Sequence, residues 1–200
     1  ILLKFYAYYI TGSMGFLSDA LESFVNLFAA VFALVMLKLS QRPADDGHMY
    51  GHSKAEYFSS AMEGALILVA AFSIIWSAIP RIIEPTPLEN INTGLLFSLL
   101  ASLVNLVVGQ ILIKNGKEKR SVVLEADGRH LMTDVWTSVG VIAGIIIVKF
   151  TGWLIIDPII AIIVAINIIF TGYKLISRSA SGLMDATIPA EDMEKVTNYL

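Results

Sequence analysis

Long runs of apolar residues recur along this chain, and they constrain its fold more than any other feature. Several approach or exceed the roughly 20 residues that a helix needs to cross about 30 Å of hydrocarbon. Only 16% of the 200 residues are charged, whereas soluble domains average about 25%. An all-α membrane protein is therefore predicted. The expected spans are a stub ending near Ile10, then about Met14 to Leu39, Phe58 to Ile83, Ile91 to Ile113, Val122 to Phe150 and Trp153 to Ile176.

These runs predict a bundle of about six transmembrane helices that occupies residues 1–180. The first helix is expected to be truncated, because the sequence starts without Met and the apolar run from Ile1 to Ile10 is too short to span a bilayer. Residues 181–200 are more polar and end in an acidic segment. We expect them to connect to, and begin, a cytosolic domain that the sequence does not contain.

Basic residues are distributed unequally between the two sets of connections. One side carries only Arg81 and Lys149. The other side carries Lys38, Arg42, Lys54, Lys114, Lys117, Lys119, Arg120, Lys174 and Arg178. Short cytoplasmic loops are enriched in Lys and Arg. Both termini are therefore predicted to be cytoplasmic. So are the two basic loops, which join the second span to the third and the fourth span to the fifth.

Polar residues inside two of the expected spans indicate a ligand site. Asp19, Glu22 and Asn26 follow one another at i, i+3 and i+7, so they share one helical face. His130 and Asp134 lie one turn apart in a later span. A charge in the middle of a span costs roughly 2.5 to 3.5 kcal/mol on insertion scales, so such residues usually serve a function.

Glu22, Asn26, His130 and Asp134 together predict an intramembrane site for a divalent metal. The chain has no cysteine, so the ligands must be oxygen and nitrogen atoms. Imidazole and carboxylate suit zinc and neighbouring metals, and zinc prefers about four ligands in a tetrahedron. Two ionised carboxylates would balance the charge of the ion.

The same side chains have another interpretation, which is hydrogen bonding between helices at about 0.6 kcal/mol per contact. For Asn26 alone the two interpretations are evenly balanced, and Asp19 is a candidate ligand, a supporting neighbour or a residue near the far interface. Glu63 is an isolated carboxylate in the third span, which should be paired, protonated or in contact with water, and a proton relay is one candidate role. Hydrogen bonding between helices accounts for the single polar residues Ser13, Ser18, Asn105 and Asn167.

A second candidate metal cluster lies in the polar connection between the second and third spans. Asp45, His48 and His52 offer one carboxylate and two imidazoles. The alternative is a solvated loop in which these residues cap helices and pair with Lys54. The chain has 3 histidines, and each of them lies in one of the two candidate clusters.

The chain resembles the transmembrane domain of the cation diffusion facilitators, which are metal/proton antiporters. The resemblance covers essentially the whole chain. It rests on Tyr9-Ile10-Thr11-Gly12-Ser13, Pro43-Ala44-Asp45-Asp46, Gly51-His52-Ser53-Lys54-Ala55-Glu56, Pro85-Thr86-Pro87 and the HxxxD element from His130 to Asp134.

By this resemblance Glu22, Asn26, His130 and Asp134 fall on the family's transport site, where ExxxN replaces the DxxxD or HxxxD of better-known members. The loop cluster falls on a second metal site. Lys54 and Asp185 fall on a charge pair that links helices near the dimer contact. The family also implies a homodimer with a cytosolic αβ metal-binding domain, and no nucleic-acid partner.

The expected activity is export of a divalent metal by alternating access, in exchange for protons. His130 is the natural exchanger, because a metal binds only the deprotonated imidazole. Zn²⁺ is favoured, and Fe²⁺, Mn²⁺, Co²⁺ and Cd²⁺ remain candidates. A bacterial inner membrane is the expected location. The rival interpretations are a metal-dependent intramembrane enzyme, although no HExxH element occurs, and a cation channel, although the polar residues gather at one depth.

Overall fold

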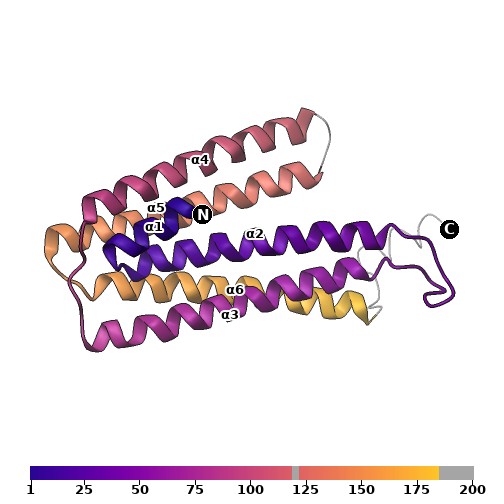
Figure 1. The fold of residues 1–200 in the computed structure, drawn as a ribbon, viewed down its shortest axis with the longest axis horizontal. Helices are drawn as coiled ribbons and strands as arrows, with labels where there is room; N and C mark the ends of the chain where they lie inside the picture. Colours follow the sequence, from indigo (N-terminus) through magenta and orange to yellow (C-terminus); the bar gives the residue numbers. More distant parts are fainter. Residues whose placement is uncertain (119–121, 185–200) are drawn as a thin grey trace, which may run out of the picture.

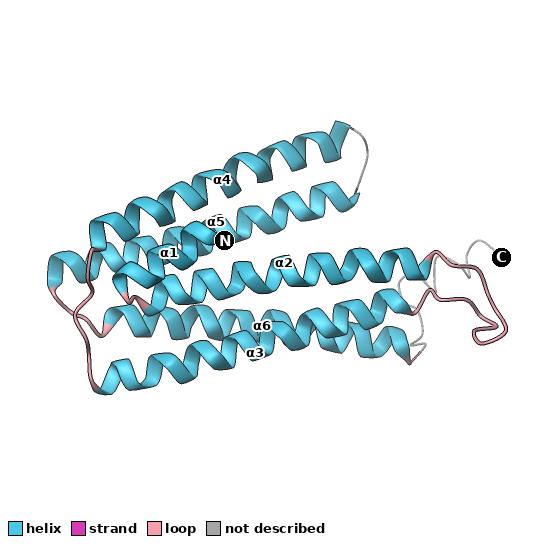
Figure 2. Ribbon diagram, in the orientation of Figure 1, coloured by secondary structure: helices cyan, strands magenta, loops and turns pink. Residues whose placement is uncertain are grey.

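The computed structural model describes residues 1–118 and 122–184, except for the side chains of residues 122–126. This part of the chain is all helical, with the order α1 (Leu2–Thr11), α2 (Met14–Ser40), α3 (Ala55–Ile83), α4 (Ile91–Glu118), α5 (Val122–Thr151) and α6 (Ile156–Leu183) (Figure 1). Figure 2 shows that loops join the helices at the two ends of the bundle. Five of the helices are long and apolar enough to cross a membrane, so the protein is an integral membrane protein.

Several helices extend beyond the spans predicted from the sequence. The prediction placed the third span at about 58–83, whereas α3 starts at Ala55. α4 and α6 run on to Glu118 and Leu183, past their apolar runs. α6 begins at Ile156 and not near Trp153, because Gly152 turns the chain with a φ of 72° and Pro158 favours the first turn of a helix.

The helices form two groups. α3 packs along α6 and also against α2, whereas α4 packs along α5, with the short α1 beside α4. Figure 1 shows the α4–α5 pair diverging from the other long helices toward the end that carries the connection between α2 and α3. α2 belongs to the group of α3 and α6, and it also contacts α1 and α5 of the other group.

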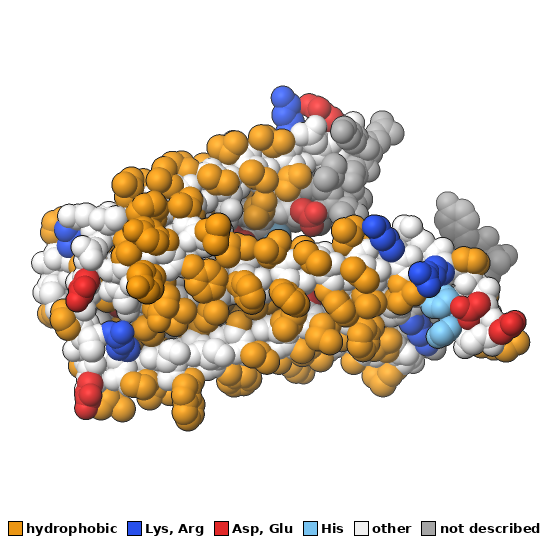
Figure 3. Space-filling view, in the orientation of Figure 1, with side chains coloured by type: hydrophobic (Ala, Val, Ile, Leu, Met, Phe, Trp, Pro, Cys, Tyr) orange, Lys and Arg blue, Asp and Glu red, His pale blue; other side chains and the backbone are white. Residues whose placement is uncertain are grey.

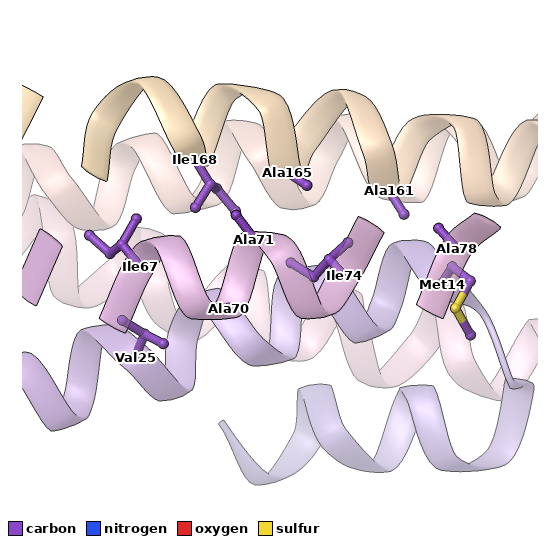
Figure 4. Packing of buried hydrophobic residues seen from close by; sticks show 10 residues of the cluster. All are labelled: Met14, Val25, Ile67, Ala70, Ala71, Ile74, Ala78, Ala161, Ala165 and Ile168. Atoms are coloured by element: carbon purple, nitrogen blue, oxygen red, sulfur yellow. The ribbon is translucent and has the colours of Figure 1, made fainter. Parts of the chain in front are cut away.

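Small residues let the helices of the first group approach closely. The buried cluster between α2, α3 and α6 includes Ala70, Ala71, Ala78, Ala161 and Ala165 (Figure 4). In the same contact, a Cβ atom added at Gly64 would lie 2.9 Å from the carbonyl oxygen of Gly172. Small side chains at such contacts are typical of membrane helices, where packing and not water exclusion drives association.

The apolar side chains that do not pack inside the bundle face outward. Figure 3 shows a broad band of hydrophobic side chains over the middle of the visible face, with charged side chains mainly toward the ends. α2 alone exposes Phe24, Leu27, Phe28, Val31 and Leu34. A surface of this kind fits a lipid bilayer and not water.

A buried carboxylate fixes the start of α2 at the opposite end of the bundle from the α2–α3 connection. Asp157 of α6 accepts hydrogen bonds from Ser13 Oγ at 2.6 Å and from the backbone N–H groups of Met14 at 2.7 Å and Gly15 at 3.0 Å. These N–H groups have no partner within the helix, so the carboxylate caps it. The expectation that Ser13 bonds between helices is confirmed, but for Ser18 it is wrong, because Ser18 Oγ donates to Gly15 O within α2.

Candidate metal site within the membrane

A small cavity of about 80 Å³ lies between α2, α3, α5 and α6. All four residues of the predicted site line it: Glu22 and Asn26 from α2, and His130 and Asp134 from α5. The full lining is Glu22, Val25, Asn26, Ile67, Ala70, His130, Thr133, Asp134, Asn167, Ile168 and Thr171. The fold thus brings together two pairs of residues that are more than 100 positions apart.

Within this cavity the carboxylates are only partly satisfied. Asn26 Nδ2 donates to Asp134 Oδ2 at 3.2 Å. The other oxygen of Asp134, Oδ1, and Glu22 Oε2 are buried and have no hydrogen-bond partner among the described residues. Buried polar atoms are nearly always paired, and an unpaired buried carboxylate is costly. Oxygen atoms in this condition are suited to bind a cation.

A second and larger cavity, of about 420 Å³, lies between α2 and the α4–α5 pair, next to α1. Asn26, His130 and Asp134 line this cavity as well as the smaller one. Asp127 and Leu112 lie nearer the ends of their helices and also line it. The larger cavity therefore leads to the candidate ligands from the side where α4 and α5 diverge.

Sequence reasoning missed two polar residues of α6. Asn167 was assigned to hydrogen bonding between helices, but it lines the small cavity with Thr171. Asn167 and Thr171 are four positions apart and thus share a helical face. This spacing was the one feature of the sequence that could have placed both residues at the site. Both side chains are polar and uncharged. Asn105, which received the same assignment, lines the larger cavity.

Asp19 lines neither cavity. It is buried, and its Oδ1 accepts hydrogen bonds from Lys4 Nζ at 2.7 Å and from Ser138 Oγ at 2.8 Å. Lys4 Nζ also donates to Ser23 Oγ at 2.8 Å. Among the alternatives left open for Asp19, this geometry favours a supporting neighbour over a metal ligand. Lys4 itself was not predicted to matter, although a lysine within an apolar helix needs a partner.

Glu63 is half-buried on α3 and lies within electrostatic range of His130. It does not line the small cavity. Its position in α3 is one turn closer to the start of the helix than Ile67, which does line the cavity. Glu63 is thus a neighbour of the site on the side of the α2–α3 connection.

The loop cluster is also brought together. One potential ligand atom from each of Asp45, His48 and His52 lies within 4.8 Å of the others. Asp45 Oδ1 is 3.1 Å from His48 Nδ1, and Asp45 Oδ2 is 3.5 Å from His52 Nε2. The hydrogen bond with the His48 side chain, aided by the backbone N–H groups of His48 and Gly47, lowers the pKa of Asp45. This carboxylate is thus kept in the form that binds metal.

Lys54 stands beside the C-terminal end of α6. Its Nζ donates to the carbonyl oxygen of Leu183 at 3.2 Å, which joins the start of α3 to the end of α6. The expected partner, Asp185, lies outside the described residues, so the Lys54–Asp185 pair stays a prediction.

Comparison with known proteins identifies the family. The model of the cation efflux transmembrane domain matches residues 1–184. The chain belongs to the cation efflux family. Among relatives of this cation efflux protein, an uncharacterized transporter of Synechocystis is 47% identical over 98% of the chain. Two proteins named cation-efflux pump FieF, from Shewanella oneidensis and Escherichia coli, are 26% and 25% identical over 98% and 100% of the chain.

The chain spans only part of these relatives. It matches 63% of the length of the Synechocystis transporter and 66% of the length of each of the two efflux pumps. The family assignment agrees with the resemblance seen in the sequence, and residues 1–184 correspond to the transmembrane domain of that family.

Proposed function

We propose that the chain forms the membrane domain of a divalent metal transporter, and that the metal binds at the small cavity through Glu22, Asn26, His130 and Asp134. One observation carries the proposal. Glu22 Oε2 and Asp134 Oδ1 come from different helices, are buried without partners among the described residues, and border the same cavity. A divalent cation would satisfy both and balance their charge.

The donor set favours Zn²⁺. One imidazole nitrogen and the oxygens of two carboxylates and one amide match the ligands that zinc uses in proteins. The amide of Asn26 is a neutral and weaker donor than a carboxylate, so Fe²⁺, Mn²⁺, Co²⁺ and Cd²⁺ are alternative substrates. Two of the relatives are named cation-efflux pumps, which supports outward transport.

The transport mechanism is alternating access coupled to protons. The larger cavity supports entry from the side of the α2–α3 connection, because three of the four proposed ligands also line it. Protons would compete with the metal for His130 and the carboxylates once the site opens to the other side. A proton gradient across the membrane could thus drive metal export.

The wider assembly follows the expectations from the family. We infer a homodimer in a bacterial inner membrane, with both termini and the α2–α3 connection in the cytoplasm. The excess of Lys and Arg at the ends of the helices on that side supports this orientation. Asp45, His48 and His52 would hold a second metal there, and Lys54 would pair with Asp185 near the dimer contact.

Metal flux into proteoliposomes tests the proposal. The purified protein is reconstituted, and uptake of Zn²⁺, Fe²⁺, Mn²⁺ and Cd²⁺ is followed with and without an imposed pH gradient. Asp134→Ala should abolish the flux, whereas Glu89→Gln, an exposed change outside the site, should leave it unchanged. Flux that persists in Asp134→Ala would place transport elsewhere, and flux that ignores the pH gradient would remove the proton coupling.

A further inference from the structure

Lys4 places a positive charge inside the membrane, next to the proposed site. Its side chain is 2% exposed, and its ammonium group contacts Asp19 Oδ1 at 2.7 Å and Ser23 Oγ at 2.8 Å. Asp19 precedes Glu22 by three positions, and Ser138, which also binds Asp19 Oδ1, follows Asp134 by four. The Lys4–Asp19 pair therefore lies about one helical turn, roughly 5 Å, from the proposed ligands on both α2 and α5.

Lys4 also borders a cavity that it shares with three of the proposed ligands. It lines the larger cavity together with Asn26, His130 and Asp134. Its charge acts on Glu22 and Asp134 as well as on Asp19. The remaining oxygen of Asp19, Oδ2, is buried with no hydrogen-bond partner in the part of the chain that the structure describes. Without Lys4, Asp19 would keep its hydrogen bond from Ser138 but would lie one turn from the metal with no positive charge beside it.

Charge balance gives the pair a role. A bound metal requires Glu22 and Asp134 in their deprotonated forms. Glu22 and Asp134, which line the small cavity, and Asp19 beside it carry three negative charges, of which Lys4 cancels one. The two that remain match a single divalent ion. Of the other acidic neighbours, Asp127 is exposed and Glu63 lines neither cavity.

We propose that Lys4 is a fixed counter-cation that sets the net charge of the transport site, and that it limits the affinity of the site for divalent metals so that the ion can be released. This inference rests on the proposed function, because it takes the small cavity as the metal site. Lys4 acts through its charge on the ligands and makes no contact with the metal.

The inference predicts opposite effects for the two members of the pair. Lys4→Met leaves Asp19 uncompensated and should tighten Zn²⁺ binding by about tenfold or more, since about 1.4 kcal/mol corresponds to a factor of ten. Asp19→Asn leaves Lys4 uncompensated and should weaken binding by a similar factor. The double variant Lys4→Met/Asp19→Asn restores the charge and should return to within about threefold of the original affinity. A pair that serves only the fold would lose affinity in both single variants.

The experiment is Zn²⁺ titration calorimetry on the detergent-solubilised protein, with His48→Ala and His52→Ala present in every sample to remove the loop cluster. The Zn²⁺ affinities of the variants are compared only for the binding step that is absent in Asp134→Ala. Lys4→Arg, which keeps the charge, serves as the matched control and should stay close to the original affinity.

The possible results separate the two proposals. Shifts of opposite sign, restored in the double variant, would support the role of Lys4. Shifts of the same sign, no shift, or a Lys4→Arg variant that behaves like Lys4→Met would overturn it. If Lys4→Met does not fold, the affinities of Asp19→Asn and Lys4→Arg test the role of Lys4. Unchanged affinity in Asp19→Asn would then overturn that role. Absence of any step that depends on Asp134 would instead remove the proposed function.

Discussion

The cap formed by Asp157 should contribute strongly to the stability of the protein. In Asp157→Asn, one side-chain oxygen can still accept from Ser13 Oγ and Gly15 N, which now bind Oδ1. The new NH₂ group would face the N–H of Met14, which now binds Oδ2 at 2.7 Å. One buried donor is left unpaired, at a cost of about 1 to 3 kcal/mol. The lost charge at the N-terminus of α2 adds up to about 2 kcal/mol.

We therefore expect Asp157→Asn to destabilise the protein by roughly 3 kcal/mol. For a chain of this size, each kcal/mol lowers the melting temperature by about 2 to 4 °C, so the expected decrease is about 6 to 12 °C. Thermal unfolding in detergent, followed by intrinsic tryptophan fluorescence, measures it. Glu84→Gln, an exposed change at the same end of the bundle, is the control and should lie within about 0.5 kcal/mol of the original protein. Equal melting temperatures for Asp157→Asn and this control would refute the reasoning.

Three further changes test other parts of the structure. Gly64→Ala should destabilise the protein by about 1 to 3 kcal/mol in thermal unfolding, because the added Cβ would crowd α6. Gly140→Ala is the control and should be neutral or stabilising, since a Cβ there meets nothing within 4 Å. Equal effects of the two changes would contradict the close approach of α3 and α6. Asn26→Asp should tighten Zn²⁺ binding by about tenfold or more in calorimetry, since a carboxylate replaces an amide; unchanged affinity would remove Asn26 from the site. The contacts of Asp45 lower its pKa and favour its ionised form in the folded loop. The stabilisation that this carboxylate gives to the loop should be complete above its ordinary pKa of about 3.9. It should be lost only as the pH falls through the lower pKa that Asp45 has in the folded protein. His52→Ala removes one of the three donors of the loop cluster, so it should abolish the Zn²⁺-dependent changes that NMR detects in the loop of the original protein. Zn²⁺ binding to the loop that survives this change would count against the cluster.

The helical spans could be predicted from the sequence because the thickness of the bilayer sets a minimum length for an apolar run. The ends of the helices were less predictable. The first turn of α3 includes Glu56, and the last turn of α4 includes Lys117. Backbone hydrogen bonds hold these polar turns in helical form beyond the apolar run, and the apolar pattern gives no sign of where they stop. Hydropathy therefore locates the spans better than it locates the ends of the helices.

The candidate site was predictable for a different reason. Carboxylates and a histidine are rare inside apolar spans, so Glu22, His130 and Asp134 stand out without knowledge of the fold. Lys4 and Asn167 did not stand out, because their importance depends on which helices pack against α1 and α6. A contact of this kind, such as Lys4 with Asp19, is set by tertiary packing and leaves no periodic pattern in the sequence.

The division of the bundle into two groups gives the cargo a mechanical role. Glu22 and Asn26 belong to α2, which packs along α3 in one group, whereas His130 and Asp134 belong to α5, which packs along α4 in the other. An ion held by all four would cross-link helices that otherwise meet over only a short stretch. The occupied protein should thus resist separation of the two groups more than the empty one does. Loss of the ion would free the two groups to change their relative tilt. If the chain transports metal as proposed, the ion would restrain this movement while it is bound and permit it after it leaves.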